Sequence, residues 1–284
     1  MNAEFKCIVL NNNNQYIKIK HANYDWQVLL VQKELLYEAL CKSLFDKTNM
    51  FFYLTQRSST KTLSETKLYV NKLEKQGLLN AEINSIFKIL GWNEETLNIE
   101  STVFQGDLAE YLMSILIEKL KISKTLISKI SLKTNSKMPI YGNDNVYFDI
   151  KSNVLYLGES KFYKSIDEGL TNAFSSIEQH DSITEINFLT NHTNNFISEN
   201  QKSLRKVQQK FETVSSQNFT LASICFVVED EMYLKKDIEE IINKYENKEQ
   251  YKPIIENSII IILPVLSKQE FLVYFKNKVG EFYE

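Results

Sequence analysis

Hydrophobic and polar positions in the first hundred residues change their period once. At the start, apolar residues suit two short strands on either side of an asparagine-rich turn. Beyond it, leucines recur at roughly helical spacing, and hydroxyl residues and glycines supply start and stop signals. We therefore predict a mainly helical N-terminal region, residues 1–100, with a short hairpin and a candidate role in binding a partner. The expected elements are the strands Phe5 to Leu10 and Tyr16 to Lys20, and the helices Trp26 to Leu44, Ser59 to Gly77 and 80–90.

From Ser101 onward the pattern alternates between strands and helices. Such alternation predicts an α/β fold with a mostly parallel sheet covered by helices on both faces. Residues 101–284 are expected to form this second unit. Its predicted elements are the helix Asp107 to Lys121, the strand Leu126 to Leu132, a hairpin within 139–161, the helix Ser165 to His180, the strand Ile183 to Leu189, the helix Phe196 to Val214, the strand Phe219 to Val228, the helix Met232 to Glu246, the strand Ser258 to Leu263 and a last helix from Gln269.

The net charge of −3 gives no global signature of a nucleic-acid-binding protein. Arginine occurs only at Arg57 and Arg205, so bidentate reading of DNA bases is not expected. Any contact with a phosphate backbone rests on two local clusters, and for the second an ordinary solvated helix face is an equally good interpretation. The clusters are Lys119, Lys121, Lys124, Lys129, Lys133 and Lys137, and then Lys202, Arg205, Lys206 and Lys210.

The cysteines, the histidines and the apolar segments of the chain indicate its cellular compartment. Its three cysteines are odd in number and far apart, which favours buried thiols in a reducing compartment over disulfides. Three histidines are too few for a histidine-rich metal site. The N-terminus lacks a signal-peptide core, and the most apolar run, Ile259 to Leu266, is too short to span a bilayer. We expect a cytoplasmic protein without a membrane partner.

The segment Glu159-Ser160-Lys161 carries the strongest chemical signal in the chain. The pattern Glu-x-Lys is weak by itself, because it occurs four times. This copy alone closes an apolar strand and has an acidic strand directly upstream. The other copies begin at Glu4, Glu65 and Glu246.

Strand geometry selects the partner of Glu159. Period two puts Glu159 and Lys161 on one face of their strand. If Lys151-Ser152 forms a two-residue turn, Asp144 lies directly across from Glu159, and such neighbours have Cβ atoms roughly 5 Å apart. Asp149 instead pairs beside the turn, far from Glu159. A slip by one residue would still leave Asp144 near the site.

These residue types suit hydrolysis of a phosphodiester. Mg²⁺ takes carboxylate oxygens, keeps several waters and is shared with substrate phosphates; Mn²⁺ can replace it. The bound ion activates a water, and Lys161 orients that water or stabilises the transition state. Glu110, on the polar stripe of the helix from Asp107, is the expected third acid, and Asp107 is the second choice.

Each candidate also has an ordinary structural interpretation. Asp144 suits a turn or the start of a strand, while Glu159 and Lys161 suit a solvated strand end. Glu110 alone would be solvent-facing. Glycines close to these acids favour the joint interpretation, because backbone that turns tightly or approaches a ligand needs them. These glycines are Gly106, Gly142 and Gly158.

Four short motifs, in order, resemble the HamA family of Hachiman antiphage defence systems, which belongs to the PD-(D/E)xK nuclease superfamily. The last motif is the most specific. The family pattern usually has glutamate where this chain has Asp107, and histidine is expected where Tyr147 stands. The motifs are Gly106-Asp-Leu-Ala-Glu110-Tyr-Leu, Ile127-Ser-Lys-Ile130, Gly142-Asn-Asp144 and Leu157-Gly-Glu-Ser-Lys-Phe-Tyr163.

The resemblance implies a fold, an activity and a partner. The fold would be restriction-endonuclease-like, a mixed sheet flanked by helices. The activity would be metal-dependent cleavage of DNA, controlled by a helicase, HamB. The implied catalytic residues are Glu110, Asp144, Glu159 and Lys161, and the implied metal ligands are Glu110, Asp144, Glu159 and Ser160.

Two other interpretations stay open. One is a catalytically silent nuclease fold that serves as a nucleic-acid-binding or regulatory subunit of a helicase complex. The other, less favoured, is a restriction or repair endonuclease of the same superfamily.

Overall fold

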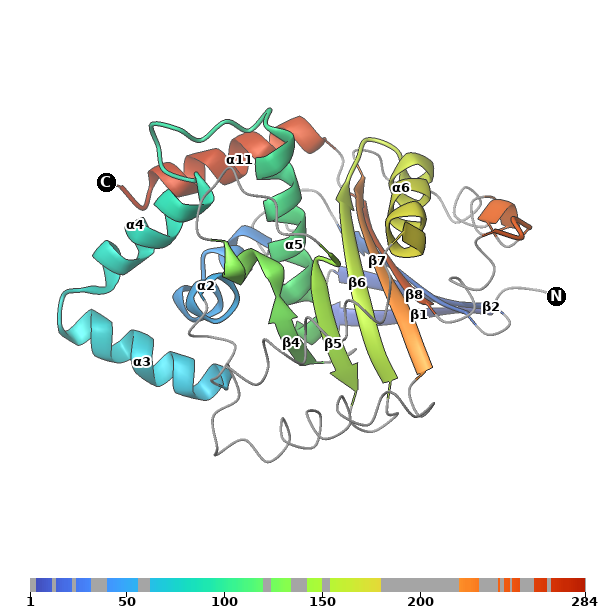
Figure 1. The fold of residues 1–284 in the computed structure, drawn as a ribbon, viewed down its shortest axis with the longest axis horizontal. Helices are drawn as coiled ribbons and strands as arrows, with labels where there is room; N and C mark the ends of the chain where they lie inside the picture. The colour runs from blue at the N-terminus through green and yellow to red at the C-terminus, as the bar shows by residue number, and fades with distance from the viewer. Residues whose placement is uncertain are drawn as a thin grey trace.

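One mixed sheet runs through the protein, which we describe from a computed structural model (Figure 1). Within the described residues it has eight strands in the order β1-β2-β3-β8-β7-β6-β5-β4. Their bounds are β1 Glu4–Asn11, β2 Asn14–His21, β3 Tyr24–Val31, β4 Lys124–Ser128, β5 Asn145–Asp149, β6 Val154–Phe162, β7 Thr220–Glu229 and β8 Ser258–Pro264. The structure describes residues 4–11, 14–21, 24–31, 40–55, 62–119, 124–133, 142–149, 154–179, 220–229, 240, 243–245, 247–250, 258–264 and 267–283.

The sheet confirms the α/β class but not the mostly parallel arrangement. The neighbouring pairs β6–β7, β7–β8 and β3–β8 are parallel. The remaining pairs, β1–β2, β2–β3, β4–β5 and β5–β6, are antiparallel. Three of these four pairs, all except β4–β5, join consecutive strands through short connections, as hairpins do.

Strand β3 corrects the predicted helix from Trp26 to Leu44. Tyr24–Val31 pairs antiparallel with β2 and parallel with β8, and helix is described only from Leu40. The segment alternates Tyr, Trp, Val and Leu with other residues, and such residues favour a pleated strand. The predicted helical spacing was misleading because β8, far away in the sequence, offers this segment a ladder partner.

The N-terminal strands therefore belong to the same sheet as the strands of residues 124–264. The division of the chain near residue 100, and the partner-binding role of the first region, stay predictions.

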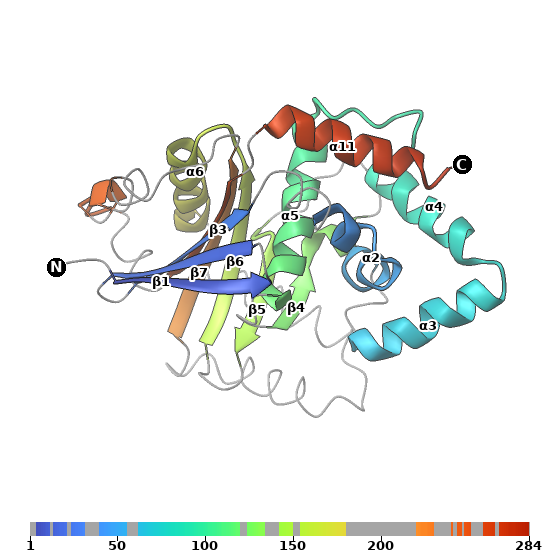
Figure 2. The ribbon, with the colours of Figure 1, turned by 180° about the vertical axis from the view of Figure 1, so that it is seen from behind.

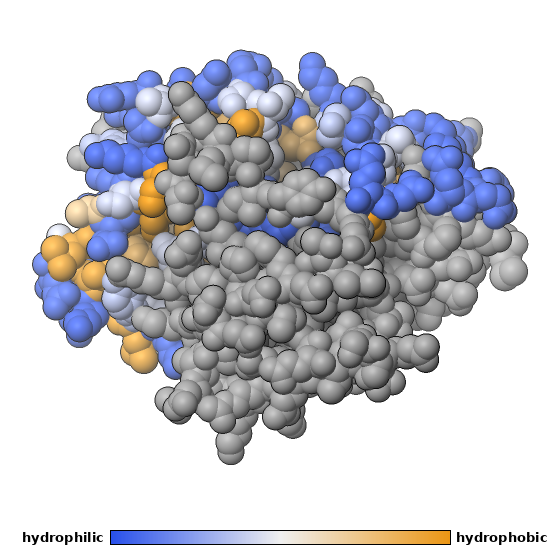
Figure 3. Space-filling model, in the orientation of Figure 1, coloured by the Kyte–Doolittle hydropathy of each residue, from blue (hydrophilic) through white to orange (hydrophobic). Residues whose placement is uncertain are grey.

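Two helices of the N-terminal region follow their predicted signals. Helix α3 (Leu63–Lys75) begins with a capping box formed by Thr62 and Glu65. Helix α4 (Leu79–Leu90) ends at Gly91, whose φ of 71° is the left-handed conformation that glycine adopts freely. Hydrophobic surface lies over this pair of helices at the left of Figure 3. Leu68, on α3, is 70% exposed.

Helix α5 (Thr102–Lys119) is the central helix of the fold, and it is buried on more sides than its pattern predicted. Leu108, Leu112, Ile115 and Leu116 are buried, and so are Phe104, Ala109, Tyr111, Met113 and Ile117, whereas Val103 near the helix start is 43% exposed. The predicted polar stripe is also mostly inside: Asp107 and Ser114 are buried and Glu110 is partly buried. The polar face of α5 is therefore an internal surface.

The elements after α5 agree largely with the prediction. The strand predicted over Leu126 to Leu132 is shorter and earlier, because its second half is the 3₁₀ turn η2 (Lys129–Leu132). Helices α6 (Ile166–Gln179) and α11 (Lys268–Gly280) and strands β7 and β8 match closely. The predicted strand Ile183 to Leu189 and helix Phe196 to Val214 lie outside the described residues, as does most of the helix Met232 to Glu246.

Helices α5 and α6 cover opposite faces of the sheet around β6 (Figures 1 and 2). A Cβ on Gly158 would lie 2.9 Å from Cε of Met113 on α5. The next residue, Glu159, accepts a hydrogen bond from Ser176 on α6. Successive strand residues point to opposite faces, so the two helices sandwich this strand.

An aromatic cluster joins the N-terminal helices to the C-terminal one. The ring centroids of Trp92 and Phe275 on α11 lie 5.3 Å apart, and those of Phe104 on α5 and Phe275 lie 5.6 Å apart. The Tyr111 hydroxyl of α5 donates to the Leu44 carbonyl at 2.5 Å, beside helix α2 (Lys47–Leu54). These contacts anchor α5, whose other side faces the hairpin. None of the described helices is long and apolar enough to cross a membrane.

Candidate active site

The hairpin of β5 and β6 has the predicted register. Asn145 pairs with Gly158, and Asp149 pairs with Val154 beside the turn. Asp144 precedes the first pair and Glu159 follows it, so the two acids face each other where the ladder ends. The backbone N–H of Lys129 donates to the Asp144 carbonyl at 3.0 Å, which fastens this strand start to η2.

Ser160 positions the Asp144 side chain. Its backbone N–H and its hydroxyl both donate to Oδ2 of Asp144, each at 2.7 Å. Two donors on one carboxylate oxygen hold the group in a single orientation. Ser160, predicted among the metal ligands, acts on Asp144 in this structure.

Two of the three glycines near the acids have a structural reason to be glycine. Gly142 has a φ of 102°, where side chains are strained. A Cβ on Gly158 would lie 2.8 Å from Tyr147, as well as against α5, so only glycine permits this close approach. Gly106 lies within α5 with nothing within 4 Å of its Cβ position, so no tight turn or close protein contact requires glycine there.

Glu159 is buried, and its two carboxylate oxygens differ. Oε1 accepts from the ammonium of Lys161 and, at 2.8 Å, from the Ser176 hydroxyl. Oε2 is buried and has no hydrogen-bond partner. Burial, together with the charge of Asp144, raises the pKa of Glu159 to about 7, against the opposing effects of Lys161 and Ser176.

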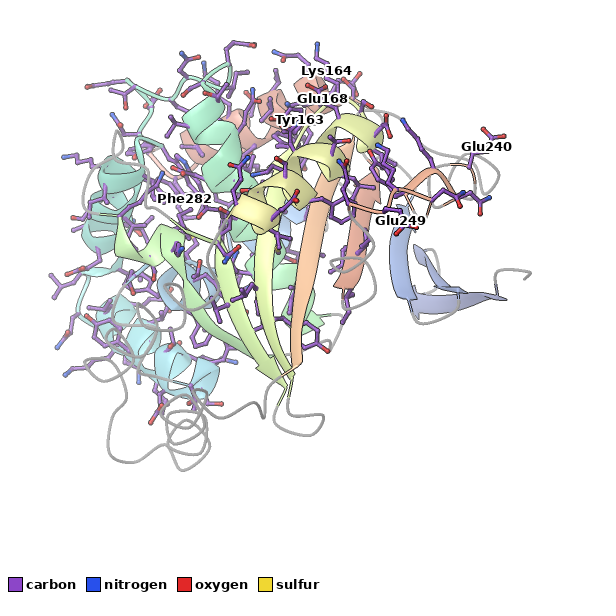
Figure 4. The ribbon with its side chains drawn as sticks, turned by 45° about the vertical axis from the view of Figure 1, so that its right-hand side comes forward. Tyr163, Lys164, Glu168, Glu240, Glu249 and Phe282 are labelled. Carbon is purple, nitrogen blue, oxygen red and sulfur yellow. The ribbon has the colours of Figure 1, made fainter. Side chains whose placement is uncertain are left out.

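Lys161 connects this acid with the surface. Its side chain is 21% exposed, whereas that of Glu159 is 4% exposed. Burial lowers the pKa of Lys161, but Glu159 and Asp144 outweigh it, and the pKa is raised. The amine therefore stays charged at neutral pH. Figure 4 shows Tyr163, Lys164 and Glu168 where β6 leads into α6, just beyond this pair.

A second buried pair lies at the start of α5. Asp107 binds the ammonium of Lys133, and both side chains are less than 5% exposed. Burial raises the pKa of Asp107 to about 6, with Lys133 opposing the shift and Asp144 adding to it. One oxygen of Asp107, Oδ2, is buried without a hydrogen-bond partner.

Glu110 completes a group of four interacting acids. Burial raises its pKa well above the usual range, and the charges of Asp144, Asp107 and Glu159 add to the effect. Its backbone carbonyl accepts from Ser114 at 3.0 Å and from Asn145 at 3.2 Å. These bonds tie the turn of α5 that carries Glu110 to the first residue of β5.

The carboxylates of this site are ligands that suit a hard divalent cation. Among the residues that the structure describes, no three His, Cys, Asp or Glu side chains are placed to hold one metal ion between them. Mg²⁺ requires less than that, because one or two carboxylates, waters and substrate phosphates commonly complete its octahedron. Glu159, which has one unpartnered oxygen, and Asp144, whose charge acts on it, are carboxylates of the kind that Mg²⁺ takes.

The first lysine cluster is not a continuous basic surface. Lys129 and Lys133 are both buried, and Lys133 is occupied by Asp107. The proposal that these two follow a phosphate backbone is wrong, since neither side chain reaches the surface. The remaining four lysines of that cluster and the whole second cluster lie outside the side chains that the structure describes.

Sequence reasoning missed three residues of this site. Ser176 contacts Glu159 from α6, Lys133 pairs with Asp107, and Asn145 joins β5 to α5. Serine on a helix and lysine after a strand are too common to be distinctive. A signal existed for Asn145 alone, because strands contain few asparagines.

A comparison with protein families covers nearly the whole chain. The HamA family model matches residues 3–279. The chain belongs to the HamA family. A comparison with curated proteins found no match. HamA membership confirms the resemblance drawn from the four motifs and implies an antiphage defence protein of the Hachiman type. The HamA match extends over the N-terminal region as well, where no motif had been recognised.

Proposed function

We propose that this protein is a metal-dependent DNA nuclease, the effector of its antiphage defence system. The observation that carries the proposal is the Glu159–Lys161 pair facing Asp144, with one carboxylate oxygen of Glu159 left without a partner. HamA membership supports the defence role. The order α5-β4-β5-β6-α6-β7, with an antiparallel hairpin followed by a parallel strand, supports a PD-(D/E)xK core.

The acids would share the work of holding Mg²⁺ or Mn²⁺. Asp144 and Glu159 would be its ligands from the hairpin, and Glu110 would approach from α5. The bound ion would activate a water and neutralise charge on the phosphate. Lys161, charged and partly exposed, would donate to a phosphate oxygen or to the attacking water. Ser160 would keep Asp144 in position.

A helicase partner fits the low charge of the chain. A net charge of −3 gives little attraction for DNA. Two of the candidate DNA-contacting lysines are internal. A helicase that delivers or exposes DNA would supply the affinity that this chain lacks.

The test is cleavage of plasmid DNA by the full chain, alone and with its helicase, with Mg²⁺ or Mn²⁺. We expect metal-dependent cleavage that depends on Glu159 and Lys161. Full cleavage by Glu159→Gln or Lys161→Ala would overturn the assignment of the site.

One observation favours the second candidate, a silent nuclease fold that regulates the helicase. In the described part of the chain the acids do not gather around a single metal position. DNA binding without cleavage, under every activating condition and with either metal, would support that function.

A further inference from the structure

Glu159 is held at one oxygen by two donors that come from different elements. Lys161 lies two residues further along β6, and Ser176 lies on α6, which crosses the opposite face from α5. The terminal torsion of a glutamate is broad and restricts the carboxylate weakly. With Lys161 alone, the group could turn about its bond to the ammonium. The second donor removes that freedom.

This arrangement directs the other oxygen. Because both donors bind Oε1, Oε2 is left buried without a partner. An unpartnered buried carboxylate oxygen costs free energy unless a ligand satisfies it. Residues that orient a ligating carboxylate commonly have a large influence on metal affinity.

Helix α6 is a rigid support for the serine. Its Ile166, Leu170 and Phe174 are fully buried. The buried Tyr245 hydroxyl donates to the Asp167 carboxylate at 2.6 Å and lies 2.7 Å from Thr171 Oγ1. The helix is therefore fixed on two sides, so Ser176 approaches Glu159 from a defined position.

We propose that Ser176 is a positioning residue that orients the metal-binding oxygen of Glu159. This inference rests on the proposed function, since it concerns how the same site binds its cation. Ser176 acts through Glu159 and need not touch the substrate.

The chain supplies a matched control in the preceding residue. Ser175 lies on the same helix, and its hydroxyl accepts from Gln179 at 3.2 Å in an exposed setting. Replacing either serine by alanine changes helix propensity equally. A loss of Mn²⁺ affinity in Ser176→Ala but not in Ser175→Ala is therefore not an effect of helix propensity.

The experiment measures Mn²⁺ binding to the full-length protein by electron paramagnetic resonance, without DNA, and the Mg²⁺ dependence of plasmid cleavage with the helicase. For Ser176→Ala we expect about 10-fold weaker Mn²⁺ binding. The Mg²⁺ concentration for half-maximal cleavage should rise by a similar factor, with a smaller change in rate at saturating Mg²⁺. Ser176→Thr, which keeps the hydroxyl, should restore both, and Ser175→Ala should match the wild type.

Three outcomes would overturn the proposal in distinguishable ways. Equal Mn²⁺ affinity for Ser176→Ala and Ser175→Ala would show that the hydroxyl does not orient the acid, while the nuclease assignment stands. Failure of Ser176→Thr to restore Mn²⁺ binding, in a variant that melts like the wild type, would have the same meaning. No Mn²⁺ binding by the wild type, with no cleavage, would overturn the proposed function and the positioning role together.

Discussion

Two buried acid–lysine pairs lie in the same part of the molecule, and they differ in access to solvent. At the end of β6, Glu159 is paired with Lys161; at the start of α5, Asp107 is paired with Lys133. Each acid follows a glycine and has one buried oxygen without a hydrogen-bond partner. The side chain of Lys161 is 21% exposed, but that of Lys133 is only 4% exposed.

Under the proposed nuclease function, this difference separates a pair that would meet the substrate from one that balances charge inside the protein. Lys161 would approach a phosphate while still bound to Glu159, to which Ser176 gives a second donor. Lys133 is enclosed, so its charge serves Asp107 and, through space, Glu110. We call the partly exposed Glu159–Lys161 pair the open pair and the enclosed Asp107–Lys133 pair the closed pair. The open pair should therefore govern activity, and the closed pair should govern stability.

The largest expected effect follows from removing the open pair's lysine. Lys161→Met should lower DNA cleavage about 100-fold or more, because a positioned cation at the developing charge is lost. Cleavage is measured on plasmid DNA with Mg²⁺ and the helicase. The control is Lys67→Met, in which the exposed lysine of the Glu65-Thr66-Lys67 copy of the same pattern is replaced, and it should leave cleavage unchanged. Similar losses in both variants would contradict the assignment.

Breaking the closed pair should lower the stability of the protein. Lys133→Met leaves the buried Asp107 charge without its partner, which typically costs about 3–5 kcal/mol of unfolding free energy. The double variant Asp107→Leu with Lys133→Met replaces both charges by apolar groups and should recover most of that loss. Urea denaturation measures both. A double variant as unstable as the single one would show that the pair has further structural roles.

Replacing the glycines that precede the two acids should change the free energy of unfolding in opposite directions. Gly158→Ala forces a methyl group against Tyr147 and Met113, and such overpacking costs roughly 1–3 kcal/mol. Gly106→Ala adds a methyl group in open space within α5 and should stabilise the protein by about 0.5–1 kcal/mol. Thermal or urea unfolding of the two variants tests this. A Gly158→Ala variant as stable as the wild type would mean that α5 does not approach β6 as closely as the structure shows.

The smallest effect is expected at an exposed pair of the same kind. Lys244 binds Asp167 with both side chains more than 40% exposed, so Lys244→Met should change the unfolding free energy by less than about 1 kcal/mol. Added salt should have little further effect in the variant, because the screened interaction is gone. A loss comparable to that of Lys133→Met would remove the distinction between enclosed and exposed pairs.

Local patterns were sufficient for much of the fold. The capping box at Thr62, the stop at Gly91 and the short apolar strands follow from side-chain and backbone preferences within a few residues. Where the prediction failed, at β3, the segment had two possible periods, and a partner strand more than 200 residues later decided between them. No pattern within β3 contains that information.

The candidate site divides in the same way. The sequence by itself predicted Asp144 opposite Glu159, on the condition of a two-residue turn, and the described pairs of β5 and β6 have that register. It also determined that Glu110 and Asp107 lie one helical turn apart. Only the tertiary structure decided that Ser176 binds Glu159 and that Lys133 is enclosed beside Asp107, because these contacts join elements whose packing no local pattern specifies. Exposure, which distinguishes the open pair from the closed one, is a property of that packing alone.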